Sequence, residues 1–244
     1  MRKLLLVLGV FLFVSFLGTM DIMAQAADAG TANLGMYQTI KQKFIEGDWK
    51  FMSIVLVCLI LGLAFSIERI ITLSLASVNT ENLLNRIEDR LASGDLEGAK
   101  DVAKATPGPA ASVLYEGLRN ANNGPEAVEK AIVSYGSVQM GLLEKGLVWI
   151  SLFIALAPML GFLGTVIGMI QAFDKIAAAG DISPNIVASG IKVALLTTVF
   201  GLIVAIILQV FYNYIVSKID SITNKMEDAS LGLVDIMARN NMFK

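Results

Sequence analysis

The sequence of 244 residues contains no histidine and one cysteine, and charged residues make up only 16% of it. Without histidine, the chain lacks the commonest metal ligand and the usual general base of enzymes. Cys58 lies in an apolar run, so the sequence offers neither a disulfide framework nor a thiolate metal site. We therefore predict a protein that is not an enzyme, with no catalytic residues, no metal site and no cofactor.

Basic residues are also few. The formal net charge is −2 and no basic face stands out, which argues against a nucleic-acid partner. What the chain does contain is apolar residues, at 55% of the total and with a mean hydropathy of +0.68. These values exceed what a soluble domain carries, and the apolar residues are concentrated in segments. The sequence therefore predicts a membrane protein.

The N-terminus has the pattern of an export signal. Arg2 and Lys3 precede an apolar segment at 4–17, and Ala24-Gln25-Ala26 places small residues at the spacing that a signal peptidase accepts. We predict a removable signal peptide, which puts the mature N-terminus outside the cytoplasm. An uncleaved first membrane helix is the alternative.

Two regions outside the membrane show helical spacing. From Pro125 no helix-breaking residue intervenes before Pro158, so we expect one continuous helix that enters the membrane. Its apolar residues at steps of three and four are Val128, Ala131, Tyr135, Val138 and Leu142. The same spacing continues beyond the last span through Ile215, Ile219, Ile222, Met226, Ala229, Leu233 and Ile236.

These patterns predict an all-α membrane protein. Three transmembrane helices follow the signal peptide, and two of them are long and extend into a cytoplasmic helical bundle. The predicted segments are a signal peptide at 1–26, a periplasmic segment at 27–50, a first span at 51–75, a cytoplasmic helical domain at 76–145, a second span at 146–172, a periplasmic loop at 173–185, a third span at 186–216 and a cytoplasmic tail at 217–244.

Small and hydroxylated residues lie on one face of the second and third spans. The two sets, spaced at three and four, are Gly161, Thr165, Gly168 and Ala172, and Ala194, Thr198, Gly201 and Ala205. One interpretation is tight helix packing in which each hydroxyl bonds to a carbonyl of its own helix. The other is a narrow lumen in which the threonines hydrogen-bond water or a guest helix.

Charged residues are nearly absent from these two spans. No carboxylate occurs at 146–170 or 186–216, so a proton-driven device needs its protonated carboxylate from a partner. Lys192 is the one ionisable residue there, and snorkelling, or pairing with Asp174 or Asp181, competes with ion transport. Pro158 is either an ordinary kink or a functional hinge. Glu68 and Arg69 are either a plain end to the apolar run or an interfacial ion pair or docking site.

The segments at 157–169 and 190–202 resemble the MotA/TolQ/ExbB proton-channel family, and most closely its ExbB members. The resemblance covers about residues 45 to 240 and implies a bacterial inner-membrane motor. The resemblance implies a homopentamer of this chain around an ExbD/TolR-like protein with a single membrane helix. It also implies that the proton gradient energises a TonB-like protein acting on outer-membrane transport. The implied lumen residues are Thr165 and Thr198, with Thr197, Gly161, Gly168, Ala194 and Gly201 beside them.

One position departs from the family pattern. Enterobacterial members carry a glutamate where this chain has Val193, which agrees with a carboxylate supplied by the partner. A TolQ-like role in envelope integrity uses the same fold and chemistry and stays open. A passive oligomeric membrane scaffold is the alternative of a different class.

Overall fold

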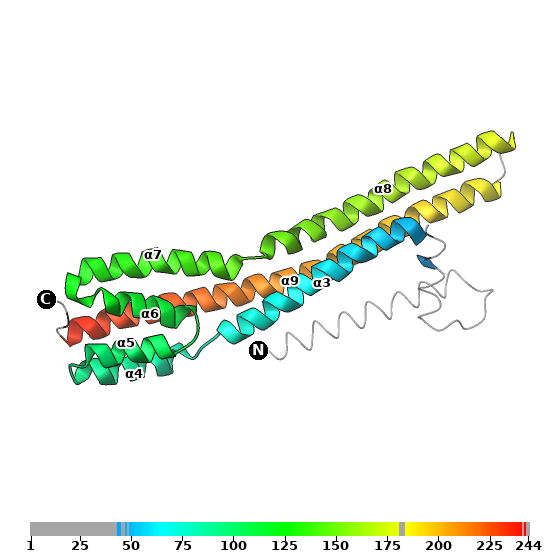
Figure 1. Ribbon diagram of the computed structural model, residues 1–244. Helices are drawn as coiled ribbons and strands as arrows, with labels where there is room; N and C mark the ends of the chain where they lie inside the picture. Colours follow the sequence, from blue (N-terminus) through cyan, green and yellow to red (C-terminus); the bar gives the residue numbers. More distant parts are fainter. Residues whose placement is uncertain (1–42, 45–46, 48, 181–183, 241, 243–244) are drawn as a thin grey trace, which may run out of the picture. The chain divides into compact units, whose positions relative to one another are not determined.

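The computed structural model describes residues 43–44, 47, 49–180, 184–240 and 242, and every regular element in these residues is helical (Figure 1). The predicted signal peptide and most of the segment that follows it lie outside the described residues. The all-helical architecture is confirmed. The elements are α3 (Trp49–Ala76), α4 (Thr80–Ala92), α5 (Leu96–Ala105), α6 (Pro109–Arg119), the 3₁₀ helix η1 (Ala121–Asn123), α7 (Pro125–Glu144), α8 (Leu147–Ala179) and α9 (Pro184–Arg239).

Three helical stretches of the described chain are long enough and apolar enough to cross a membrane. They are Phe51–Ala92, Pro125–Ala178 and Pro184–Arg239. The third of them is a single helix, α9, of 56 residues. The apolar span and the amphipathic tail are therefore one continuous helix, as the spacing predicts.

The expectation of one continuous helix from Pro125 into the membrane is wrong. Helix α7 ends at Glu144, Lys145 leaves the helical conformation with ψ of 127°, and Gly146 has φ of +90° before α8 begins at Leu147. A residue with a side chain rarely adopts that positive φ, so glycine permits the break. Helix α8 then continues without interruption through Pro158 to Ala179.

The chain divides into two compact units, residues 1–52 with 165–197 and residues 53–164 with 198–244. In the second unit, α4 to α7 gather around the C-terminal part of α9 (Figure 1). Their shared core includes Ile87, Leu114 and Leu233, none of which is exposed to solvent. Two smaller clusters of this unit join α3, α8 and α9. Helix α9 contributes to all three clusters and is the central element of the unit.

The predicted packing face of the tail is confirmed. All seven of its residues, from Ile215 to Ile236, are buried. The predicted face of α7 is only partly correct, because Val138 and Leu142 are 56% and 54% exposed while Ile132 and Leu143 are buried. Helix α7 has two neighbouring apolar stripes, and the spacing of its residues does not select the one that packs within the chain.

The short helices start where local chemistry favours a start. The Asp95 carboxylate accepts a hydrogen bond from the Gly98 N–H at 2.8 Å and caps α5. Helices α6 and α7 each begin with a proline at the first position, where its missing N–H costs no helical bond.

Candidate functional site

Two threonine hydroxyls connect α8 to α9. The Thr165 hydroxyl donates to the Ala194 carbonyl oxygen at 3.3 Å, and the Thr198 hydroxyl donates to the Gly161 carbonyl oxygen at 3.2 Å. The Thr197 hydroxyl instead donates to the Ala194 carbonyl of its own helix at 2.7 Å, and Thr197 is 1% exposed. Thr197 therefore matches the expected bond within one helix, whereas Thr165 and Thr198, both half-buried, bridge two helices.

In the second unit, Gly201 lets the backbones of α8 and α9 touch. A Cβ atom added to Gly201 would lie 2.5 Å from the Ala157 carbonyl oxygen and 3.1 Å from the Gly161 Cα. Gly161 and Gly201 are both buried. The close approach brings the Gly161 carbonyl within reach of the Thr198 hydroxyl, so the glycine and the threonine belong to one contact.

The first unit repeats this arrangement nearer the α8–α9 connection. A Cβ on Gly168 would lie 3.2 Å from the Ala194 nitrogen, and a Cβ on Gly190 would overlap the Ala172 side chain. Gly168, Ala172, Gly190 and Ala194 are all buried. In each unit, the small residues of α8 therefore pack against small residues of α9, with one threonine bonded across the contact.

The other candidate residues of these helices lie outside the two threonine contacts. Lys192 is exposed on α9 and Asp174 is exposed on α8, while Asp181 lies outside the described residues. Pro158 is half-buried inside α8. No group of three or more acidic or cysteine side chains among the described residues is placed to hold a metal ion.

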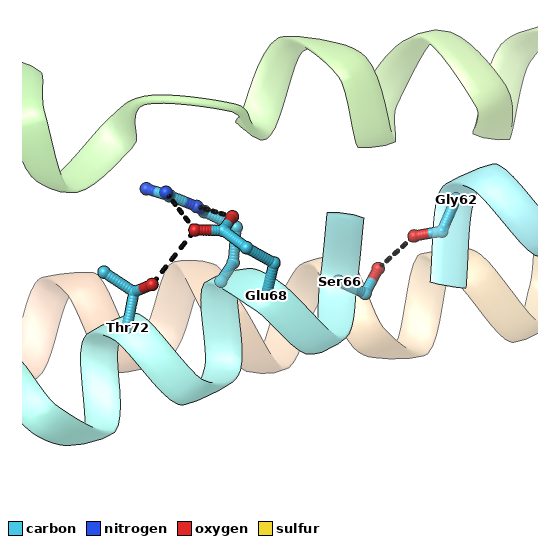
Figure 2. A network of polar contacts seen from close by, with 5 residues as sticks. Gly62, Ser66, Glu68 and Thr72 are labelled. Atoms are coloured by element: carbon cyan, nitrogen blue, oxygen red, sulfur yellow. Dashed lines mark hydrogen bonds and ion pairs between the residues drawn. The ribbon is translucent and has the colours of Figure 1, made fainter. Parts of the chain in front are cut away.

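Glu68 and Arg69 form an ion pair in the C-terminal part of the first predicted span. The guanidinium donates from Nε and from one terminal nitrogen to the two carboxylate oxygens, each at 2.6 Å. Thr72 also donates to this carboxylate at 3.0 Å (Figure 2). The Arg69 side chain is 11% exposed and lies beside Gly146, whose added Cβ would be 3.5 Å from its Cδ and Nε. Arg69 therefore covers the break between α7 and α8.

Sequence reasoning missed a pair of amides in the third span. The Gln209 Nε2 donates to the Asn213 Oδ1 at 2.9 Å, and both side chains are exposed. The available signal was two amide residues four positions apart in a helix whose neighbouring residues are almost all apolar.

Known proteins resemble this chain in sequence and in fold. A model of the MotA/TolQ/ExbB proton channel family matches residues 105–228. A biopolymer transport protein ExbB homolog of Methanothermobacter thermautotrophicus is 33% identical over 170 residues, which cover 69% of this chain and 60% of that protein. The biopolymer transport protein ExbB of Xanthomonas campestris is 27% identical over 170 residues, which cover 66% and 67%. The chain thus spans less than two thirds of the first of these relatives.

A solved structure adds evidence for the fold alone. The structure of C. jejuni MotAB aligns with a TM-score of 0.50 and 16% sequence identity, covering 98% of this chain and 94% of that one. The family match, by contrast, extends over about half of the sequence and includes α8, with both threonine contacts. The chain therefore belongs to the MotA/TolQ/ExbB proton channel family.

Proposed function

We propose that this chain is the channel subunit of an energy-transducing motor of the ExbB type in the bacterial inner membrane. The observation that carries the proposal is the pair of cross-helix bonds from Thr165 and Thr198, in spans that contain no carboxylate. A hydroxyl both donates and accepts hydrogen bonds but does not titrate near neutral pH. Such residues suit a path along which a proton moves between water and a titratable group on another protein.

The proposed partner is an ExbD/TolR-like protein with a single membrane helix and a carboxylate in that helix. A homopentamer of this chain would surround the partner helix, with Thr165 and Thr198 facing it and Thr197, Gly161, Gly168, Ala194 and Gly201 supporting them. Through the partner, the proton motive force would energise a TonB-like protein and transport across the outer membrane. Support comes from family membership and from the ExbB descriptions of the two relatives.

The threonine bonds suggest how the lining responds to the partner. The Thr198 hydroxyl donates to the Gly161 carbonyl oxygen, and a hydroxyl oxygen can also accept a hydrogen bond, here from a protonated carboxyl of the partner. When the carboxyl ionises, the hydroxyl can rotate and donate to it instead, since its bond of 3.2 Å is long for a hydroxyl donor. The guest helix would then be bound differently in its two protonation states, as a shift or rotation of that helix requires.

The proposed topology follows from an exported N-terminus. The mature N-terminus and the connection between α8 and α9 would be periplasmic, and the bundle of α4 to α7 with the end of α9 would be cytoplasmic. Glu68, Arg69 and Gly146 would then lie near the inner surface, where a charged pair meets water. Pro158 and Lys192 would lie toward the outer half of the membrane, as structural or coupling residues.

The test is the substitution of each cross-helix threonine by valine, which keeps the shape and removes the hydroxyl. Thr165→Val and Thr198→Val should each abolish proton flux in vesicles that contain the complex with its native partner, while the complex stays assembled on native gels. Thr165→Ser and Thr198→Ser should retain flux, because serine keeps the hydroxyl. Normal flux in both valine variants would remove the lining assignment.

A passive scaffold is the second candidate, and the absence of carboxylates from the two spans favours it. The two functions differ in their dependence on the partner. If the chain conducts protons, replacement of the partner's membrane carboxylate by its amide stops flux in the same vesicles. A scaffold would conduct no protons with either version of the partner.

A further inference from the structure

The amide pair of Gln209 and Asn213 has no role in the packing described above. Both side chains are exposed, whereas Leu208, next to Gln209, is fully buried in the cluster that joins α3, α8 and α9. The two amides therefore point away from the packed side of α9. Residue 209 precedes the predicted end of the span at 216 by about 10 Å along the helix axis, which places it within the apolar region.

Gln209 shares a helix face with Thr198. The two residues are 11 positions apart, which corresponds to about three turns, about 16 Å along the axis and an offset of about 20° around it. Both lie in one continuous helix. A path that passes the Thr198 hydroxyl and follows this face toward the bundle of α4 to α7 reaches the Gln209 amide next.

The pair has unused hydrogen-bonding capacity. The Gln209 amide N–H bonds to the Asn213 carbonyl, and among the described residues neither the Gln209 carbonyl oxygen nor the Asn213 amide has a further partner. Hydrocarbon supplies no partner for such groups, and membrane proteins normally turn them toward another helix or toward water. Exposed apolar residues of the same helix, such as Leu202 and Ile206, need no hydrogen-bond partner and can face lipid.

We propose that Gln209, held in place by Asn213, lines the cytoplasmic end of the proton path and binds water or a hydrated proton through its carbonyl oxygen. This inference rests on the proposed function, because it extends the Thr198 lining to the inner end of the span. An amide does not titrate, so Gln209 acts by accepting hydrogen bonds from water and by keeping this end of the path hydrated. The proton itself resides on water or on the partner's carboxylate.

The first experiment measures proton flux in vesicles that contain the complex with its native partner. Gln209→Leu should lower flux about tenfold, the factor that corresponds to about 1.4 kcal/mol and to roughly one net hydrogen bond. Gln209→Asn, which keeps an amide, should retain more flux than Gln209→Leu. Val210→Leu is the matched control, because Val210 is the next residue, is 63% exposed and lies about 100° further around the helix.

A second measurement uses cysteine accessibility and does not depend on the size of the flux. Cys58 is the sole cysteine and is replaced by alanine to give a background without thiols. In that background, Gln209→Cys should react with a small water-soluble thiol reagent and Val210→Cys should not. A Gln209→Cys variant that is assembled but unreactive would place this position in lipid or in a dry helix contact and would overturn the inference.

The outcomes separate the two proposals. If Thr198→Val abolishes flux and Gln209→Leu leaves it normal, the inference fails and the proposed function stands. If neither substitution changes flux, or if the unmodified complex conducts no protons, the proposed function fails and the inference fails with it. If Gln209→Leu disassembles the oligomer, the pair is a contact between copies of this chain and the inference is overturned.

Discussion

Replacement of Gly201 by alanine tests whether backbone contact between α8 and α9 supports the proposed threonine lining. The added Cβ would lie 2.5 Å from the Ala157 carbonyl oxygen, about 0.9 Å closer than the 3.4 Å at which ordinary contacts begin. The obstacle is backbone, which has no rotamer to change. The two helices must therefore separate locally, and a displacement of that size would stretch the Thr198 bond from 3.2 Å beyond hydrogen-bonding range.

The expected cost combines two effects of opposite sign. Overpacking of a close contact costs about 1–3 kcal/mol, while alanine gains about 0.5–1 kcal/mol over glycine in a helix interior. The difference between the centres of the two ranges is a net destabilisation of about 1 kcal/mol for Gly201→Ala. The measurements are thermal unfolding of the purified protein in detergent and proton flux in vesicles, and both should fall.

Two further variants make this prediction specific. Gly168→Ala should have a smaller effect, because its Cβ would meet backbone atoms of Ala194 at 3.2–3.3 Å and needs a shift of only a few tenths of an ångström. Adding Ala157→Gly to Gly201→Ala should not restore stability, because the clash is with the Ala157 carbonyl and not with its methyl group. A Gly201→Ala protein as stable as wild type, or one restored by Ala157→Gly, would refute the backbone-contact argument.

Two other substitutions test the fold by the same unfolding measurement. Gly146→Ala should destabilise the protein by about 1–2 kcal/mol, because a side chain at its positive φ is strained. Gly136→Ala in α7 should stabilise the protein by about 0.5–1 kcal/mol, because the added methyl group meets open space. Equal effects of these two would contradict the break at Gly146. Leu233→Ala should cost about 2–5 kcal/mol because Leu233 is fully buried, and Leu231→Ala, at a 69% exposed position, should change stability by less than about 0.5 kcal/mol.

The sequence predicted the helical tail accurately because its apolar residues stand out against polar neighbours. From Ile215 to Ile236 the apolar positions at steps of three and four alternate with charged and polar residues, which leaves one face for the core. In α7 the same method failed at Val138 and Leu142, because a second apolar stripe lies beside the first. Which of the two stripes packs depends on where α9 lies, and a pattern within α7 carries no information about that.

The break at Gly146 was not predictable for a related reason. Glycine is common inside membrane helices, where it serves close packing, so its presence does not indicate an interruption. Its positive φ follows from the path of the chain between α7 and α8. The sequence predicted that the small residues of α8 and α9 share one face of each helix. It left open whether each threonine hydroxyl bonds within its own helix. The Thr197 hydroxyl does, whereas those of Thr165 and Thr198 bond to the other helix.

Packing and the proposed conduction therefore depend on the same residues. Gly161 contributes its carbonyl oxygen to the Thr198 hydroxyl and its Cα to the contact with Gly201, so a change in the distance between the helices changes the hydrogen bond. In the proposed motor, a guest carboxylate that takes the Thr198 hydroxyl also removes one bond between α8 and α9. Proton binding on the partner would thus be coupled to the packing of these two helices, and α9 extends without interruption into the bundle at its other end.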